Sequence, residues 1–325
     1  MKKTLITGAS GFVGKHLIEL LLKENKQVCF SQNNQIFGTY LDPKSIDSLS
    51  IFKDKLNLAK IDLKDEKGVF SLIEEIKPDF IFHLAAFTSP AESFNDPKET
   101  IVNNILTELN ILEALRKLSL SNTRILITSS ADIYGKVKKE NLPINEDCPL
   151  NPTDPYAVSK IAQDFLALQY FNAYGLKTIR TRAFNHVGPG QSPNFVVSAF
   201  AKKIAQLEKG LHNEITVGNL EAKRDFTDVR DMVQAYAQII EKGEPGEVYN
   251  IGSGISIKIS ELLENLTKLV NKKITISIDK KLFRPVDNPE LVCDATKIGK
   301  TINWRPEIPL NKTLEDTLNY WRNQI

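Results

Sequence analysis

The sequence contains few cysteines and few histidines, and neither type of residue is grouped. No two cysteines form a CxxC pair, and no two histidines stand at the spacing of metal ligands. We therefore expect neither a disulfide framework nor a metal site. The residues concerned are Cys29, Cys148, Cys293, His16, His83, His186 and His212.

Long apolar runs and an excess of one charge are also lacking. No run approaches the roughly 20 residues of a membrane-spanning helix, and the apolar segment that follows Lys3 is too short for a signal peptide. The 42 basic and 40 acidic side chains leave a formal charge of +2, which creates no general field for nucleic acid. We therefore expect a cytoplasmic protein that binds neither membranes nor nucleic acid, with room for a local basic pocket.

What is present is a globular composition with alternating strand and helix patterns. At 325 residues, with 42% hydrophobic and 25% charged residues, the chain suits a large α/β domain, with or without a smaller lobe. The alternation predicts a doubly wound parallel sheet of the Rossmann type. The predicted strands are 3–7, 35–41, 58–62, 79–86, 124–129 and 177–183. One predicted helix follows the first strand and ends near residue 25, and two further helices span 71–76 and 99–118.

The second half begins with a clearly delimited helix and then becomes less regular. Asp154 is the expected N-cap, Pro155 the first helical residue and Gly175 the stop. A helix at 196–209, a strand at 214–217 and a Pro-rich stretch at 284–289 follow, and 247–250 is expected to return to the main sheet. We therefore predict an α/β fold with a smaller interleaved C-terminal substrate lobe. Its dinucleotide-binding domain comprises 1–185 plus about 226–254, and the lobe about 186–225 and 255–325.

A glycine loop follows the first strand and opens the first helix. Its GxxGxxG spacing allows backbone amides to approach a pyrophosphate at a helix N-terminus, which predicts a bound dinucleotide. A tight structural turn is the alternative when the loop is taken alone. The predicted contacts are Gly8, Ser10, Gly11, Phe12, Val13 and Gly14.

Two acidic residues are candidates for the adenosine half of the cofactor. Asp62, followed by Leu63, is expected to accept from the adenine amino group, unless it is a solvated residue at a strand end. Asp42 would bind the ribose hydroxyls, although it lies further from Gly14 than the usual distance of about 20 residues, which we attribute to an insertion at 30–34. Asp42 can equally cap the turn before Pro43. NAD is therefore favoured only slightly over NADP.

A Tyr-x-x-x-Lys pair begins the helix after Asp154. The spacing places Tyr156 and Lys160 on one helix face. Lowering a phenol pKa from about 10 to about 7 requires about 4 kcal/mol, which one cation about 4 Å away supplies at an effective dielectric near 20. A packed tyrosine beside a solvated lysine is the commoner origin of this pattern. Here, however, Ser130 belongs to the segment 128–135 that ends a predicted strand of the same sheet, where ligand chemistry belongs in doubly wound folds.

Several motifs together resemble the extended short-chain dehydrogenases/reductases. GASGFVG, HLAA at 83–86, SSADIYG, YAVSK and RAFNHVGPG carry this resemblance over nearly the whole chain. The segments 185–193 and 217–231 and the pair Arg284-Pro285 resemble the GDP-6-deoxy-D-mannose reductases more closely. That family shares its fold and its sugar-nucleotide site with the GDP-mannose 4,6-dehydratases.

The resemblance implies a role for each residue that matches a family motif. Ser130 would hydrogen-bond the sugar carbonyl, Tyr156 would exchange its proton, and Lys160 would bind the nicotinamide ribose while tuning Tyr156. A GDP-sugar substrate and a homodimer formed through helices 99–118 and 155–174 are also implied, although those helix faces can equally be buried within one monomer. Further cofactor contacts would be Leu84, Ala85, Ala86 and Thr128, and substrate contacts Thr88, Asn185, Val196, Lys202, Arg224 and Arg284. Each of these two arginines can instead form a surface ion pair.

The reaction outcome depends on Asp132. Members of the dehydratase family place a Thr and a Glu where this chain has Ser130 and Asp132. Because Asp is shorter by one methylene, it is less well suited to elimination at C5 and C6, and we favour simple reduction of a C4 ketone. A dehydratase, a C4 epimerase with the same trio, and a catalytically silent NAD(P) sensor remain alternatives.

Overall fold

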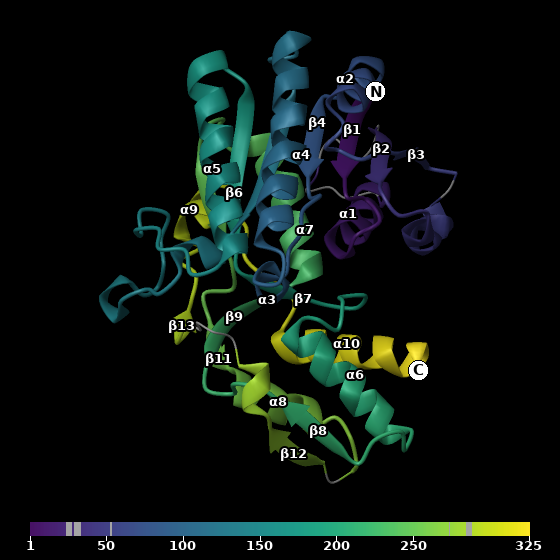
Figure 1. Ribbon diagram of the computed structural model, residues 1–325, viewed down its shortest axis with the longest axis vertical. Coiled ribbons are helices and arrows are strands. Elements are labelled where there is room, and N and C mark those ends of the chain that lie inside the picture. Colours follow the sequence, from purple (N-terminus) through teal and green to yellow (C-terminus); the bar gives the residue numbers. More distant parts are fainter. Residues whose placement is uncertain (24–27, 29–33, 53, 273, 284–287) are drawn as a thin grey trace.

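A seven-stranded parallel sheet forms the middle layer of the larger part of the molecule, in the upper half of Figure 1. The structure is a computed structural model, and it describes residues 1–325 except 24–27, 29–33, 53, 273 and 284–287. The strand order β10-β6-β5-β4-β1-β2-β3 confirms the predicted doubly wound fold. Chain order reverses between β1 and β4, the place where such sheets bind ligands. The strands are β1 (Lys2–Thr7), β2 (Asn34–Tyr40), β3 (Leu56–Lys60), β4 (Phe80–His83), β5 (Arg124–Ser130), β6 (Lys177–Ala183) and β10 (Val248–Ile251).

Three helices cover one face of this sheet: α2 (Glu66–Ile76), α4 (Pro97–Lys117) and α5 (Pro155–Tyr174). Their buried sides meet the sheet in a core that includes Ile111 and Ala167. As predicted, Asp154 caps α5, accepting a hydrogen bond from the backbone N–H of Ala157, and Gly175 ends the helix in a left-handed conformation.

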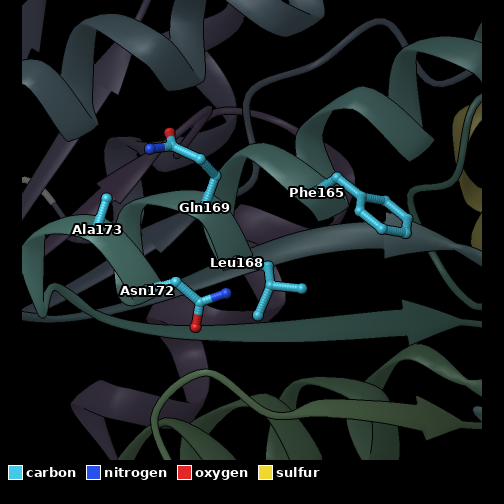
Figure 2. Close-up of a pocket in the computed structure, with 5 residues that line it drawn as sticks. All are labelled: Phe165, Leu168, Gln169, Asn172 and Ala173. Atoms are coloured by element: carbon cyan, nitrogen blue, oxygen red, sulfur yellow. The ribbon is translucent and has the colours of Figure 1, made fainter.

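A shallow pocket opens on the outer side of α5 (Figure 2). Its lining residues are Phe165, Leu168, Gln169, Asn172 and Ala173.

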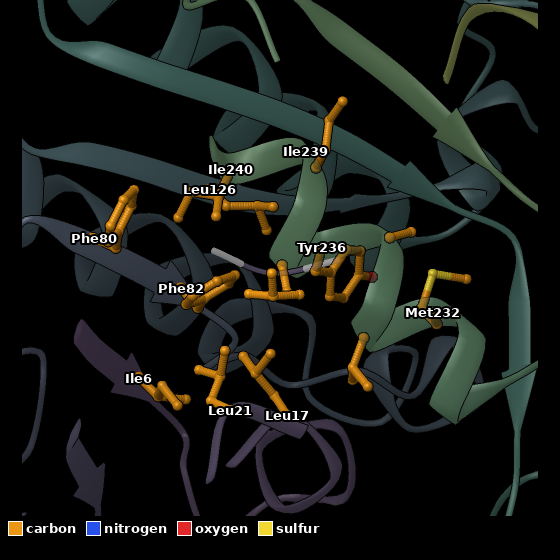
Figure 3. Close-up of a cluster of buried hydrophobic side chains, with 14 of the residues drawn as sticks. Ile6, Leu17, Leu21, Phe80, Phe82, Leu126, Met232, Tyr236, Ile239 and Ile240 are labelled. Atoms are coloured by element: carbon orange, nitrogen blue, oxygen red, sulfur yellow. The ribbon is translucent and has the colours of Figure 1, made fainter. Parts of the chain in front are cut away.

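The opposite face is covered by α1 (Phe12–Leu22), α7 (Val229–Lys242) and α9 (Thr296–Ile302). Figure 3 shows Leu17 and Leu21 of α1 lying near Phe82, with Tyr236 of α7 in the same cluster. Because all of these side chains are fully or almost fully buried, they fix α1 against the sheet and so fix the position of the glycine loop at its start.

A second cluster of elements forms the lobe in the lower part of Figure 1. Its helices are α6 (Val196–Glu208), α8 (Ile259–Thr267) and α10 (Leu310–Gln324). Two small sheets complete it, with β9 pairing β7, β11 and β13, and β8 pairing β12. Their bounds are β7 (Asn185–Val187), β8 (Glu214–Val217), β9 (Lys223–Asp228), β11 (Ser256–Lys258), β12 (Thr275–Ile278) and β13 (Glu290–Leu291). The remaining short elements are α3 (Pro90–Ser93), η2 (Pro43–Phe52), η3 (Ala131–Tyr134), η4 (Lys139–Asn141) and η5 (Lys280–Leu282).

Some predicted boundaries differ from the structure. β4 ends at His83 rather than at 86, because the Thr7 hydroxyl accepts the N–H groups of Leu84 and Ala85 and draws the chain out of the sheet. The helix predicted at 71–76 begins earlier, at Glu66, where Asp65 caps it. The expected insertion at 30–34 lies, apart from its last residue, outside the described residues.

The predicted domain boundaries stay a prediction, but one element bears on them. α9 falls within 255–325, the range assigned to the lobe, yet Ile298 and Ile302 belong to the core beneath the main sheet. Trp304, just after α9, is buried in the same core and donates to the backbone carbonyl of Asp231. The chain therefore returns to the main sheet before α10 re-enters the lobe.

Candidate active site

The glycine loop connects β1 to α1 in a conformation that suits only small residues. Gly8 has φ of +66°, which favours glycine. A Cβ on Gly14 would lie 2.5 Å from the carbonyl oxygen of Gly8. The loop is tied to β2 by the Ala9 N–H, which donates to the Thr39 carbonyl at 2.9 Å. Both glycines therefore hold the start of α1 close to the end of β1.

The N-terminus of α1 is open to a ligand. Gly11 is its N-cap, is exposed, and makes no side-chain capping hydrogen bond. The first helical N–H groups, of Phe12 and Val13, therefore have no capping side chain, and a pyrophosphate is the kind of group that such an end binds. Ser10 is half-buried beside them and accepts from the Ser45 hydroxyl at 2.8 Å. The residues present fit a dinucleotide.

Both acidic candidates for the adenosine half are exposed and make local turn contacts. Asp42 accepts the N–H of Lys44 at 2.9 Å, so the capping alternative is realised. Asp62 makes the same contact with the N–H of Lys64. Leu63 is buried, and its carbonyl accepts from the Asn110 amide. Both carboxylates are therefore still accessible to a cofactor.

The catalytic candidates meet where β5 ends and α5 begins. Ser130 is the last residue of β5 and hydrogen-bonds the hydroxyl of Tyr156 through its side chain. Its Oγ also accepts the N–H of Asp132 at 3.1 Å. The Lys160 ammonium lies 5.9 Å from the centroid of the Tyr156 ring and donates to the backbone carbonyl of Thr128 at 2.8 Å. The structure thus brings the predicted trio together.

The pKa of Tyr156 moves in the direction opposite to the one that we expected from spacing. Burial raises it above the ordinary value, and the negative charge of Asp132 adds to this, while the hydrogen bond from Ser130 opposes it. The Lys160 ammonium, which donates to the Thr128 carbonyl, is not one of the main causes of this shift. Tyr156 is therefore protonated at neutral pH in the ligand-free protein.

The lysine itself is strongly affected by its surroundings. Lys160 is only 2% exposed, and burial lowers its pKa to about 8. The charge of Glu108, on α4, opposes that shift. A buried ammonium whose pKa lies near the working pH is typical of functional sites.

The segment after β4 completes the wall beside the glycine loop. A Cβ on Gly8 would lie 3.0 Å from the Cα of Ala85, so the two chain segments touch. Leu84, Ala85 and Ala86 are half-buried and Thr88 is exposed. Asn104 of α4 fixes this segment by bonding both backbone groups of Phe87.

The substrate candidates are more scattered. Asn185 is exposed at the start of β7, and Val196 is half-buried at the start of α6. The Lys202 ammonium lies 5.1 Å from the centroid of a Trp321 ring. Arg224 is buried and donates to the carbonyls of Lys223 and Asn288. Arg284 lies outside the described residues.

Sequence reasoning missed a buried polar group next to Lys160, made of His83, Gln163 and Glu108. All three side chains are 0% or 1% exposed. A signal for Glu108 was available, since it stands four residues after Asn104 and four before Leu112, in phase with the buried face of α4. Gln163 stands four residues after Ser159, about one turn further along the buried face of α5, and this spacing was the corresponding signal for Gln163.

The described residues contain neither a candidate membrane span nor a candidate metal site. No helix in those ranges is both long and apolar enough to cross a membrane. Within the same ranges, no group of His, Cys, Asp and Glu side chains is placed to hold a metal ion. Cys148 and Cys293 are buried free thiols, and Cys29 lies outside the described part of the chain.

Comparison with known proteins places the chain in a family. The sequence model of the family described as GDP-mannose 4,6 dehydratase matches residues 5–317. The GDP-6-deoxy-D-mannose reductase of Pseudomonas aeruginosa is 34% identical over 100% of this chain and 98% of its own length. GDP-mannose 4,6 dehydratase 1 of Arabidopsis thaliana is 29% identical over 97% of this chain and 88% of its own.

A solved structure agrees with these sequence relatives. The structure described as RMD from Pseudomonas aeruginosa complexed with NADPH superimposes with a TM-score of 0.85 at 33% identity, covering 100% of both chains. The resemblance that the motifs indicated is confirmed. The chain therefore belongs to the GDP-mannose 4,6 dehydratase family, within the extended short-chain dehydrogenases/reductases.

Proposed function

We propose that the protein reduces the C4 ketone of a GDP-4-keto-6-deoxyhexose with NADH or NADPH and releases a GDP-6-deoxyhexose of the GDP-D-rhamnose type. One observation carries the proposal. Ser130, Tyr156 and Lys160 meet at the end of β5 in a chain that is 34% identical, over its whole length, to a GDP-6-deoxy-D-mannose reductase. The relative described with NADPH supports a nicotinamide cofactor.

The cofactor would be held by main-chain groups and a lysine. The N–H groups at the start of α1, beside Ser10, would bind its pyrophosphate, and Gly8 and Gly14 leave the space for it. Leu84, Ala85, Ala86 and Thr128 would line its path, and Lys160 would bind the nicotinamide ribose. When bound, the reduced nicotinamide supplies the hydride that C4 receives.

Tyr156 and Ser130 would act on the ketone oxygen. As charge develops on that oxygen, the Tyr156 phenol donates its proton and the Ser130 hydroxyl donates a hydrogen bond. The raised pKa of Tyr156 supports this direction, because a reduction must begin with the phenol protonated. The phenolate that remains regains its proton from solvent before the next cycle.

The nucleotide part of the substrate would lie against the lobe. Arg224 and Arg284 suit the diphosphate, because guanidinium groups bind phosphate oxygens through paired N–H donors. Arg224 already donates to main-chain carbonyls, which fixes its side chain before substrate arrives. The other proposed substrate contacts are Thr88, Asn185, Val196 and Lys202.

A GDP-mannose 4,6-dehydratase is the second candidate, and Asp132 is the observation that favours it. The Asp132 carboxylate is half-buried close enough to Tyr156 to raise its pKa. An elimination needs an acid/base beside the sugar, and one relative with 29% identity is such a dehydratase. Against it, the side chain is one methylene shorter than the Glu of the dehydratases, and such displacements cost rate.

Two incubations of the purified protein separate the candidates. With GDP-4-keto-6-deoxymannose and NADPH or NADH, the proposal predicts stoichiometric loss of the reduced-nicotinamide absorbance. With GDP-mannose alone, it predicts no keto sugar. Conversion of GDP-mannose to a keto sugar, without cofactor oxidation in the first incubation, would establish the dehydratase instead.

We also propose that the protein is a homodimer and that it is cytoplasmic. In the proposed dimer, a second copy of the chain packs against the outer surface of α4 and α5. Leu106 of α4 and Val158 and Phe165 of α5 are apolar side chains that are each more than a third exposed, and Phe165 also lines the pocket of Figure 2. Light scattering should give twice the chain mass, and Phe165→Lys should give the monomer; a monomeric unmodified protein would contradict the dimer. Cell fractionation tests the compartment.

A further inference from the structure

Glu108 is a fully buried carboxyl that the proposed reaction does not use. It lies on α4, on the side that packs against α5, and is 0% exposed. Neither of its oxygens receives a hydrogen bond from a described donor when Gln163 Nε2 is turned toward His83, and Gln163 Oε1 is then unpaired as well. An unpaired buried carboxyl costs free energy, so its surroundings need an explanation.

The hydrogen bonds around His83 determine how the Gln163 amide must be oriented. The Thr7 hydroxyl accepts two backbone N–H groups, so its own proton goes to His83 Nδ1, 2.9 Å away. Burial and the charge of Lys160 lower the pKa of His83 to about 3, so its single proton sits on Nε2. That N–H needs an acceptor, but it faces Gln163 Nε2 at 3.5 Å, which is a second donor.

Exchanging the oxygen and nitrogen of the Gln163 amide resolves both conflicts. Gln163 Oε1 then accepts from His83, and the Gln163 NH₂ group donates to Glu108, which it already adjoins. A continuous chain of hydrogen bonds results, from Thr7 at the end of β1, through His83 and Gln163, to Glu108. Every donor in this chain is directed toward the carboxyl, which favours its ionised form and opposes the effect of burial.

Glu108 is also the acid that acts on Lys160. Burial raises the pKa of Glu108 well above its ordinary value and lowers that of Lys160 to about 8, and the charge of each group opposes the shift of the other. The nearby carboxylate of Asp164 is already engaged, because Arg180 and Arg182 donate to it at 2.7 and 2.9 Å. His83 and Tyr156, two further titratable groups beside Lys160, are neutral at pH 7. The charge of Asp132 acts on Tyr156 and is not among the causes of the Lys160 shift.

We propose that Glu108 is the buried counter-ion of Lys160 and acts as a positioning residue, keeping the Lys160 ammonium charged and held against Thr128. The inference extends the proposed function, because it assigns the group that prepares the lysine for the nicotinamide ribose. Glu108 touches neither substrate nor cofactor in this scheme, and Lys160 transmits its effect.

Titration of Lys160 in the ligand-free protein tests the proposal directly. Protein labelled with ¹³C and ¹⁵N in lysine would be titrated by NMR, and the Lys160 signal assigned by its loss in Lys160→Arg. Removing a nearby opposite charge shifts a pKa by about 1 to 3 units, so Glu108→Gln should lower the Lys160 pKa by about one unit or more. Glu108→Asp should shift it less, and Glu113→Gln, a carboxyl on the same helix, should leave it unchanged.

An unchanged Lys160 pKa in Glu108→Gln would overturn the proposal. The signal is read without substrate or cofactor, so a wrong assignment of the reaction cannot produce that result. In active protein, the alkaline limb of the kcat profile should move to lower pH by the same amount in Glu108→Gln.

A second measurement serves if Glu108→Gln proves too unstable to titrate. Glu108→Gln, Lys160→Met and the double variant would be compared by urea unfolding of the full chain. A counter-ion pair predicts that the double variant loses less in midpoint than the two single losses added together, because neither charge is left alone. Additive losses would contradict the pairing.

Discussion

The Lys160 ammonium donates a hydrogen bond of 2.8 Å to the backbone carbonyl of Thr128. This contact ties the lysine to the end of β5, two residues before Ser130. Tyr156 beside it stays protonated in the ligand-free protein, chiefly because it is buried. A protonated phenol is the form in which the group can complete the reduction of a ketone.

Replacing Tyr156 by Phe should remove turnover and keep cofactor binding. The phenol supplies only the proton in this scheme, so kcat should fall by about 10²- to 10⁴-fold, the usual contribution of a general acid. Steady-state kinetics and fluorescence titration with NADPH measure the two effects. Retained turnover would remove Tyr156 from its role.

A Gly14→Ala change should weaken cofactor binding. The new Cβ would lie 2.5 Å from the Gly8 carbonyl oxygen and 2.7 Å from that of Ala9, so α1 must move away from the loop. We expect a loss of about tenfold in affinity, equal to about 1.4 kcal/mol, in calorimetric titration with NADPH. Gly299→Ala in α9, with its nearest atom at 3.5 Å, is the matched control. Equal affinities for the two variants would argue against the loop as the pyrophosphate site.

Asp42→Asn should alter the choice between cofactors. If the carboxylate at 42 faces the ribose, it repels a 2′-phosphate, and its removal should raise kcat/KM for NADPH relative to NADH. An exposed charge pair worth about 1 kcal/mol corresponds to roughly fivefold. Asn can still accept the Lys44 N–H, so the turn is preserved. An unchanged ratio of the two kcat/KM values would mean that Asp42 only caps the turn and does not bind the cofactor.

Glu113 should make stability depend on pH in the acid range. Arg116 donates to it twice at 2.8 Å and Tyr170 at 2.6 Å, and chiefly the Arg116 hydrogen bond lowers its pKa to about 2. A lowered pKa stabilises the fold above the unfolded value of about 4.3, and the effect is lost as pH falls toward about 2. Glu113→Gln should cost about 1 kcal/mol at pH 7, after allowance for partial exposure.

Thermal unfolding across this range measures that effect. The difference between Glu113→Gln and the unmodified protein should shrink between about pH 4 and pH 2. Glu140→Gln on η4 is the control, because that side chain is 73% exposed and its cationic neighbour Lys138 lies 3.7 Å away, beyond hydrogen-bond distance. A difference that persists at pH 2 would mean that shape, and not charge, makes Glu113 stabilising.

Features set by local rules were predictable from the sequence. Asp154, Pro155 and Gly175 fix the two ends of α5, because capping depends on residues within one turn. The strand, glycine loop and helix around Gly8 follow from equally short-range patterns. These elements bring Ser130 and Tyr156 together at one edge of a parallel sheet, as the sequence predicted.

Contacts between distant segments were not predictable in the same way. Arg180 and Arg182 occupy β6 as charged residues, but both are buried because Asp164 of α5 pairs with them. Glu108 likewise lies inside because Gln163 and Lys160 come from another helix. The pKa of Tyr156 depends chiefly on its burial and on the charge of Asp132, which the spacing of Tyr156 and Lys160 does not determine.

Identification of the product by NMR distinguishes reduction of the C4 ketone from the other reactions. After incubation with GDP-4-keto-6-deoxymannose and NADPH or NADH, the account predicts one GDP-6-deoxyhexose with a new C4 proton, which is replaced by deuterium when the cofactor carries deuterium at its transferable position. The configuration at C4 is read from the same spectrum, where the account predicts GDP-D-rhamnose. Recovery of unchanged ketone, with GDP-mannose instead converted to that ketone, would contradict the account.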